Sequence, residues 1–226
     1  MKVISLSPAD PEQVLRYMGT PPHRADEALR GLVARCDAEL RKAVRPRWLS
    51  ATVTLCPEGD SIRLSNGLLL PGRDIRAHLA GCDRAVLLCA TLGAQADRLI
   101  RAAQCIDPLQ ALALDCCASD LVEQLCDRAE AELQASFPGC HFPYRYSPGY
   151  GDLPLSLNAG LLEALNAPIR LGLCATSSHI LTPRKSVTAI LGVSRTPINR
   201  EKRSCTGCPA HESCAYRKTG GHCGIL

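Results

Sequence analysis

Residues 61–70 read Ser61-Ile62-Arg63-Leu64-Ser65-Asn66-Gly67-Leu68-Leu69-Leu70. The pair Asn66-Gly67 between two apolar runs is typical of a two-residue β-hairpin, because the favoured turn needs a positive φ at both central residues. We therefore expect strands at 61–65 and 68–70 to pair antiparallel. A turn this short cannot make the crossover of a parallel sheet, so the hairpin favours an α+β fold.

Helix and strand patterns alternate along the rest of the chain up to about residue 194. Capping residues and apolar spacing predict helices at about 10–18, 25–44, 74–79, 94–104, 107–136 and 156–165. β-rich or short apolar runs predict strands at about 48–55, 85–91, 169–174 and 186–193. We expect one antiparallel sheet covered by helices, followed by a small cysteine-rich C-terminal appendage.

Composition excludes several classes of protein. The net charge of +4 over 226 residues is mild and only 4% of residues are aromatic, so neither an electrostatic footprint nor a base-stacking surface for nucleic acid is indicated. The N-terminus lacks a signal-peptide pattern, and the apolar runs are far shorter than a membrane span. These features predict a cytoplasmic protein.

The segment 145–152 reads Arg145-Tyr146-Ser147-Pro148-Gly149-Tyr150-Gly151-Asp152. Arg145 can donate a bidentate pair of hydrogen bonds to a carboxylate, and the tyrosines can stack on a flat ring or face a cation. The glycines let the backbone approach a ligand closely. S-adenosylmethionine carries a carboxylate, an aromatic base and a positive centre. The same residue types also build ordinary packed turns, which is the alternative interpretation.

Three segments together resemble the activation domain of cobalamin-dependent methionine synthase, and the third of them resembles its free-standing versions. Arg145 to Tyr150 is similar to the family signature R-x-x-P-G-Y, and 183–189 is similar to a later P-x-x-S-V-[ST] segment. The third is Leu87-Leu88-Cys89-Ala90-Thr91-Leu92-Gly93 with the following 97–99. The resemblance spans about residues 10 to 195 and implies a curved antiparallel sheet with helices.

The resemblance also implies a function and a set of site residues. In this family the domain binds S-adenosylmethionine and covers the corrin. The reduction of inactive Co(II) cobalamin is unfavourable, and methyl transfer from S-adenosylmethionine drives it by consuming the reduced cobalamin. The cofactors supply the chemistry, and the protein supplies position and electrostatics. By this resemblance Arg145 is the loop arginine and Glu123 the carboxylate for the ligand's ammonium. Ser147 and Gly149 would offer backbone groups and Tyr150 an aromatic contact. On residues alone, Glu123 fits a solvated helix face equally well.

Some positions depart from the family pattern. Ile190 and Leu191 stand where the fused enzymes carry an aromatic pair, with a tyrosine near the corrin. Ser177 stands where a glutamate is common, and no position matches the N-terminal aspartate that contacts S-adenosylmethionine. The departures concern mainly the corrin side of the mechanism and leave open whether the chain supports methyl transfer.

Four of the 14 cysteines lie in the last 22 residues, with the spacing C-x2-C-x5-C-x8-C: Cys205, Cys208, Cys214 and Cys223. A C-x-x-C pair is a common metal chelate, so the cluster indicates either structural zinc or an iron–sulfur cluster able to carry an electron. A reduced tail that binds nothing is the alternative. The upstream cysteines fit small buried hydrophobic residues of a reducing compartment.

The sequence thus predicts two parts, a ligand-binding domain at 1–195 and a metal-binding appendage at 196–226. The leading hypothesis is an accessory protein that binds S-adenosylmethionine and reactivates the cobalamin of a separate methionine synthase, with a low-potential electron donor as a further partner. The alternatives are a metal or iron–sulfur electron donor to corrinoid proteins and a non-catalytic sensor of S-adenosylmethionine. Neither nucleic acid nor membrane is expected as a partner.

Overall fold

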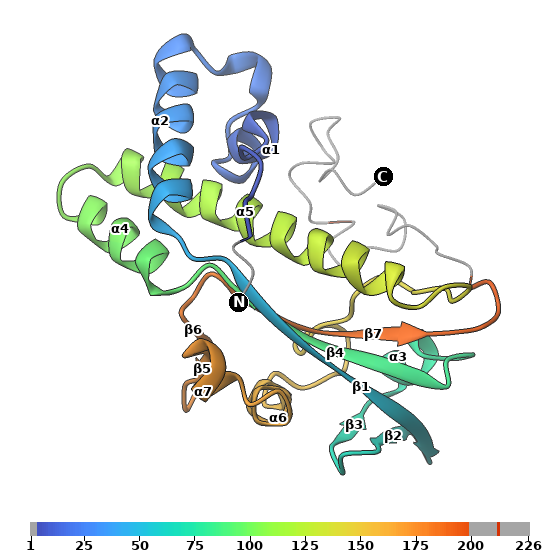
Figure 1. The fold of residues 1–226 in the computed structure, drawn as a ribbon. Helices are drawn as coiled ribbons and strands as arrows, with labels where there is room; N and C mark the ends of the chain where they lie inside the picture. The colour runs from blue at the N-terminus through green and yellow to red at the C-terminus, as the bar shows by residue number, and fades with distance from the viewer. Residues whose placement is uncertain (1–3, 199–211, 213–226) are drawn as a thin grey trace.

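The computed structural model describes residues 4–198 and residue 212. A five-stranded antiparallel sheet in the order β3-β2-β1-β4-β7 forms its centre. The sheet curls into half of a barrel, and helices lie on both of its faces (Figure 1). Its strands are β1 (Arg47–Glu58), β2 (Ser61–Leu64), β3 (Leu69–Pro71), β4 (Arg84–Thr91) and β7 (Ser186–Val193).

The hairpin forms at Asn66-Gly67, but only Gly67 of this pair has a positive φ, so the turn is not the two-residue type that the pair favours. Gly67 has a φ of 88°, and its N–H donates to the carbonyl of Leu64, while the N–H of Leu64 donates to the carbonyl of Leu68. Strand β2 then pairs with β3 in register Ile62 to Leu70. The antiparallel class expected from Asn66-Gly67 is confirmed.

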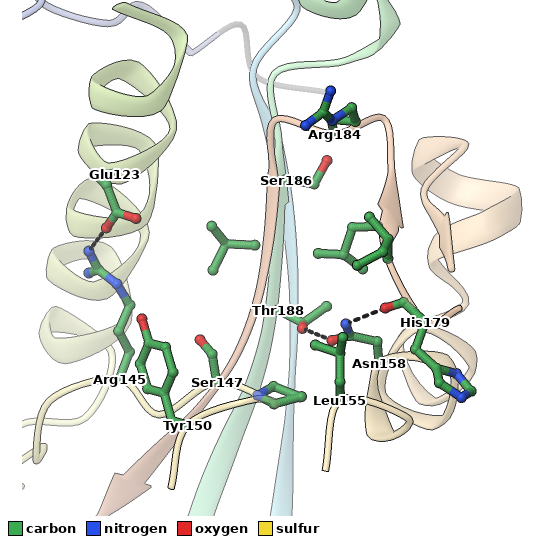
Figure 2. A pocket seen from close by; sticks show the side chains of 14 residues that line it. Glu123, Arg145, Ser147, Tyr150, Leu155, Asn158, His179, Arg184, Ser186 and Thr188 are labelled. Atoms are coloured by element: carbon green, nitrogen blue, oxygen red, sulfur yellow. Dashed lines mark hydrogen bonds and ion pairs between the residues drawn. The ribbon is translucent and has the colours of Figure 1, made fainter. Parts of the chain in front are cut away.

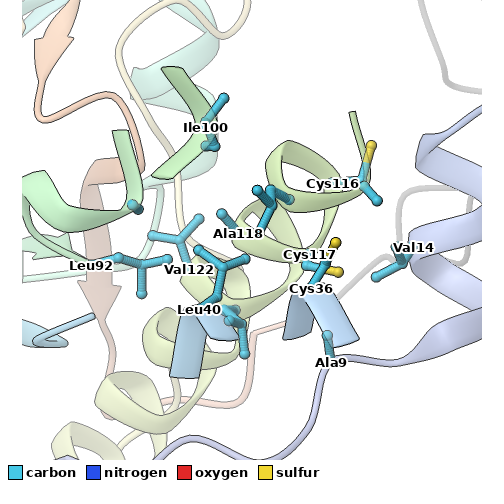
Figure 3. Packing of buried hydrophobic residues seen from close by; sticks show 14 of the residues in the cluster. Ala9, Val14, Cys36, Leu40, Leu92, Ile100, Cys116, Cys117, Ala118 and Val122 are labelled. Carbon is cyan, nitrogen blue, oxygen red and sulfur yellow. The ribbon is translucent and has the colours of Figure 1, made fainter. Parts of the chain in front are cut away.

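One layer of helices packs on the first face of the sheet and extends beyond it. Its members are α1 (Pro11–Tyr17), the short 3₁₀ helix η1 (Pro22–Arg24), α2 (Glu27–Ala43), α4 (Ala94–Gln104) and α5 (Pro108–Ala135). The long α5 begins at Asp107, whose side chain accepts from the N–H groups of Leu109 and Gln110, with Pro108 at the first helical position. The residues that pack these helices together include Cys36, Leu40, Cys117 and Val122 (Figure 3).

The opposite face is covered by α3 (Arg73–His78), α6 (Leu157–Ala164) and α7 (Ala167–Leu171), and the small pair β5 (Cys174–Ala175) and β6 (Leu181–Thr182) lies beside them. Strand β4 shows why both faces need a cover. Val86 and Leu88 pack against one cluster, whereas Leu87 and Cys89 pack against the other, and all four are buried. A strand buried on both sides reads as a continuous apolar run, as β4 does.

The predicted strand at 169–174 is wrong. Most of that segment forms α7 (Ala167–Leu171), and a strand of two residues follows only at Cys174. Asn166 adopts a left-handed conformation, Pro168 sits in the first turn, and Gly172 closes the helix with a φ of 67°. Arg47 holds the helix end by donating to the carbonyls of Arg170 and Leu171. Local capping and this long-range contact override the apolar pattern of the segment.

The expected α+β fold, a curved antiparallel sheet flanked by helices, is confirmed. The other predicted helices and strands agree with the structure to within about three residues at most ends, although β1 extends to Glu58, past the predicted end. The cysteine-rich appendage at 196–226 lies almost wholly outside the described residues.

Candidate functional site

The loop between α5 and α6 is fixed along the edge strand β7. Tyr146 and Ile190 exchange two backbone hydrogen bonds, and His141 and Ser194 do the same further along. These bridges continue the antiparallel pairing and cover part of the exposed edge of the sheet. The loop that carries Arg145 is therefore held in register with the strand that carries Thr188.

The second half of the loop docks on α3. The carboxylate of Asp152 accepts from the backbone N–H groups of Arg73 at 2.7 Å and Asp74 at 3.2 Å, which caps the first turn of that helix. Gly151 has a φ of 51°, and a Cβ there would collide with the side chain of Asp74 and lie 2.5 Å from the hydroxyl oxygen of Tyr146. Only glycine fits this place without strain.

The two loop tyrosines have different roles. Tyr146 is buried, and its hydroxyl donates to the carbonyl of Tyr150 at 3.2 Å. The two rings meet edge to face with centroids 5.8 Å apart. Tyr150 is 40% exposed. Tyr146 thus supports the loop from inside, while Tyr150 presents a ring at the surface.

Arg145 bridges the loop to three carboxylates on α5. Glu123, Asp127 and Glu130 follow at a spacing of four and three residues, so they lie on one face of the helix. The Nη2 atom of Arg145 donates to Glu123 at 2.5 Å, and Nη1 donates to Asp127 at 2.7 Å and also to Glu130. Burial alone would lower the pKa of Arg145, but the hydrogen bond and charge of Glu130, with those around it, raise it above its ordinary value.

A pocket of about 350 Å³ lies beside this ion cluster. Figure 2 shows it between α5 and the loop on one side and α6 with the segment around His179 on the other. The lining residues are Glu123, Arg145, Ser147, Pro148, Tyr150, Leu155, Asn158, His179, Ile180, Leu181, Arg184, Ser186, Val187 and Thr188. Both apolar and polar side chains line it.

The wall opposite Arg145 is built around Asn158. This side chain is buried, donates to the carbonyl of His179 at 2.9 Å and accepts from the hydroxyl of Thr188 at 2.6 Å. One amide therefore ties α6 to β7 and to the turn before β6 (Figure 2). The buried polar network gives the wall a fixed shape.

The upper rim comes from the segment before β7. Ser186 donates to the carbonyl of Pro183, and the N–H of Arg184 donates to Asp97 on α4. Lys185 lies 2.9 Å from Asp115, which ties the same segment to α5. The side chain of Arg184 remains exposed and makes no ion pair with the part of the chain that the structure describes.

The structure places four of the five predicted ligand residues on this pocket, namely Glu123, Arg145, Ser147 and Tyr150. Gly149 is outside the lining. It shapes the loop instead, with a φ of 91° and an N–H that donates to the carbonyl of Leu153. Cys205, Cys208, Cys214 and Cys223 lie outside the described residues. Within residues 4–198 and at 212, no group of histidine, cysteine and acidic side chains is arranged to hold a metal ion.

Sequence reasoning missed Asn158 and His179 as pocket residues. Asn158 is one polar residue within an apolar helical run, Leu157 to Leu162, and that was the available signal. His179 gave no signal, because its position depends on a positive φ of 65° in an irregular turn. The departures Ile190 and Leu191 are both fully buried, so neither side chain reaches the surface. Ser177 lies exposed in the turn before β6.

Comparison with known proteins identifies the fold. No protein-family model and no curated protein sequence matches the chain. Among solved structures, the chain is similar to the MetH reactivation domain bound to AdoHcy, with a TM-score of 0.58. The two share 14% sequence identity over 87% of this chain and 73% of that one. The fold is that of a MetH reactivation domain.

The reactivation domain of similar fold was solved with AdoHcy bound, which is the demethylated form of S-adenosylmethionine.

In the described part of this chain, no helix has the length and apolar character needed to cross a membrane.

Proposed function

We propose that this chain binds S-adenosylmethionine in the pocket beside Arg145 and supports the reductive methylation of cobalamin held by a separate methionine synthase. The observation that carries the proposal is the pair Arg145–Glu123 at the edge of a 350 Å³ pocket, in a fold that resembles a reactivation domain. A cation and an anion side by side match the carboxylate and ammonium of an α-amino acid.

The charges of the pocket suit a ligand that is a zwitterion with an extra positive centre. Three carboxylates surround the guanidinium of Arg145, so the ion cluster beside the pocket carries surplus negative charge. In our proposal the ligand's carboxylate pairs with Arg145 and its ammonium pairs with Glu123, the one carboxylate of the three that lines the pocket. A cation in a partly desolvated site needs such a partner.

The remaining contacts follow from the loop. Tyr150 offers an exposed ring for the adenine, and Ser147 offers backbone and hydroxyl groups. Gly149 holds the turn that brings both to the pocket. Bound S-adenosylmethionine would supply the methyl group, while the protein holds it in place and limits access of water.

The cobalamin-bearing partner would dock over the pocket mouth, where Tyr150, Leu155 and Ile180 are exposed. We propose that residues 1–195 form the binding unit, which matches the end of the sheet at Val193. The four cysteines at 205–223 would form a separate zinc or iron–sulfur site, and an iron–sulfur cluster would let the chain pass on a low-potential electron.

Calorimetric titration with S-adenosylmethionine tests the binding. We expect binding by the full chain and a loss on the order of 30-fold or more in Arg145→Ala, because truncating one partner of a buried charge pair costs about 2 to 5 kcal/mol. Arg63→Ala is the matched control, since the exposed side chain of Arg63 is ion-paired to Glu58, away from the pocket lining. No binding by the full chain, or equal binding by Arg145→Ala, would contradict the proposal.

Reconstitution tests the second half of the function. An inactive methionine synthase without its own activation domain is given reductant, S-adenosylmethionine and this chain. Recovery of methylcobalamin supports reactivation, whereas binding without recovery favours a sensor. Anaerobic purification with metal analysis and a visible spectrum tests the tail, and a colourless protein with stoichiometric zinc would remove the role of electron carrier.

A further inference from the structure

The contacts of Arg145 are divided between its two terminal nitrogens. Nη1 is held by Asp127 and Glu130, whereas among the described residues Nη2 is held by Glu123 alone. The two ends of the guanidinium can therefore exchange partners separately.

The three carboxylates also differ in exposure and in position. The side chain of Glu130 is 21% exposed, like that of Arg145, while Glu123 is 47% and Asp127 is 70% exposed. Glu123 lines the pocket, and neither Asp127 nor Glu130 does. Charge pairs shielded from solvent are screened less than exposed ones, so the contact with Glu130 is the strongest of the three.

A ligand that carries an ammonium and a carboxylate would change only one side of this cluster. The ammonium competes with Arg145 for Glu123, which faces the pocket. Once Glu123 turns to the ligand, Nη2 loses its partner and can take the ligand's carboxylate. Nη1 keeps its contacts outside the pocket, so the arginine does not have to be positioned anew.

We propose that Glu130, supported by Asp127, is the positioning residue that anchors Arg145 in its binding orientation, and that Glu123 is the partner exchanged on binding. The identity of the ligand rests on the proposed function, but the anchoring itself does not. Glu123 and Glu130 lie on one face of α5, seven positions apart, so ligand exchange and anchoring are separated along the helix.

The first test needs no ligand. Nitrogen NMR of the arginine side chains in the full chain reports how fast the guanidinium of Arg145 rotates about its Nε–Cζ bond, and the Arg145→Lys variant assigns the signal. We expect slow rotation in the wild type and in Glu123→Gln. We expect rotation at least tenfold faster in Glu130→Gln, and a smaller change in Asp127→Asn.

Glu132→Gln is the matched control, because Glu132 lies on the same helix and pairs with Arg128 instead of Arg145. It should leave the rotation of Arg145 unchanged. Slow rotation in Glu130→Gln, or equal acceleration in Glu123→Gln and Glu130→Gln, would overturn the proposal.

The second test separates positioning from general damage. Binding is measured for S-adenosylmethionine and for its decarboxylated analogue, which keeps the ammonium and the sulfonium but lacks the carboxylate. We expect Glu130→Gln to weaken S-adenosylmethionine about tenfold and to leave the analogue nearly unchanged, whereas Glu123→Gln weakens both. Equal weakening of both ligands by Glu130→Gln would show a structural role and would overturn the proposal.

The two tests also distinguish a failure of the anchoring by Glu130 from a failure of the proposed binding of S-adenosylmethionine. If the wild type binds neither compound, the proposed function fails, and the rotation measurement still decides whether Glu130 anchors Arg145. If the wild type binds both and the selectivity of Glu130→Gln is unchanged, the function stands and the anchoring fails.

Discussion

Tyr146 and Ile190 are paired by two backbone hydrogen bonds, from the N–H of Tyr146 at 3.0 Å and from the N–H of Ile190 at 2.8 Å. The pairing places the side chain of Ile190 inside the core, where it is fully buried beside Leu87 and Tyr146. By the resemblance, Ile190 stands where the fused enzymes carry one residue of an aromatic pair, with a tyrosine near the corrin. In this chain the side chain of Ile190 instead packs under the binding loop, in the same buried cluster as Tyr146.

Ile190→Tyr should therefore disrupt the core without placing an aromatic ring at the surface. Over-packing of a dense interior costs about 1 to 3 kcal/mol, so we expect the free energy of unfolding to fall by that amount in urea titrations. Ile169→Tyr is the control, because Ile169 is 85% exposed on α7 and should change stability by less than about 0.5 kcal/mol. Wild-type stability in Ile190→Tyr would contradict the burial of Ile190.

Gly151→Ala tests the joint between the loop and α3. The new Cβ would collide with Asp74 and the Tyr146 hydroxyl, in a backbone conformation that already disfavours side chains. We expect a loss of about 1 to 3 kcal/mol of stability in urea titrations. Gly139→Ala is the matched control: Gly139 also has a positive φ, of 72°, but a Cβ there meets nothing within 4 Å. Equal losses of stability in both variants would show that the backbone conformation, and not the collision with Asp74 and Tyr146, causes the effect of Gly151→Ala.

Much of the fold could be predicted from the sequence because its signals are local. Asn66-Gly67 determines a turn by itself, and Asp107-Pro108 determines where α5 begins. The segment 169–174 shows the limit. Its short apolar run favoured a strand, but Pro168, Gly172 and the contact from Arg47 make it a helix that ends at Leu171. A contact between residues 124 positions apart has no local signal.

The candidate site was predictable to a similar degree. The group of Arg145 and Tyr150 stands out because cation, rings and glycines fall within a few residues. The carboxylates Asp127 and Glu130 have no signal of their own in the sequence, and the return of the chain along β7 brings Arg145 onto them. Chemistry-bearing residues are visible in a sequence, whereas the partners that orient them depend on the fold.

Asn158 and Thr188 provide a test of the buried wall of the pocket. Thr188→Val removes the donor to the Asn158 amide, and Asn158→Leu leaves the Thr188 hydroxyl and the His179 carbonyl without this partner. Each change should cost about 1 to 3 kcal/mol in urea titrations, because a buried polar group without a partner keeps its desolvation cost.

The double variant should cost less than the sum of the two, by about 0.5 to 3 kcal/mol, since both single changes break the same hydrogen bond. Thr52→Val on the exposed side of β1 is the control and should be nearly neutral. Strict additivity of Asn158→Leu and Thr188→Val would show that the pair does not act as one unit.

The ionisation of Asp120 should lower the free energy of unfolding as the pH rises from acid to neutral. Burial raises the pKa of its carboxyl, with the charges of Asp10 and Asp37 adding to the effect, and hydrogen bonds from Gln124 and the N–H of Asp10 oppose it. A folded-state pKa above the unfolded value gives a stabilising contribution that is complete below the unfolded pKa, near 3.8. That contribution is lost as the pH rises through the folded pKa.

Asp120→Asn should remove this pH dependence and keep the local contacts. Both hydrogen bonds reach the same oxygen, Oδ2, which the amide oxygen of asparagine can replace. We expect a higher urea midpoint than wild type at pH 7, and a difference that shrinks as the pH falls toward 3. Glu163→Gln removes one exposed negative charge and controls for net charge. A difference that stays constant from pH 7 to 3 would show that the ionisation of Asp120 is not its cause.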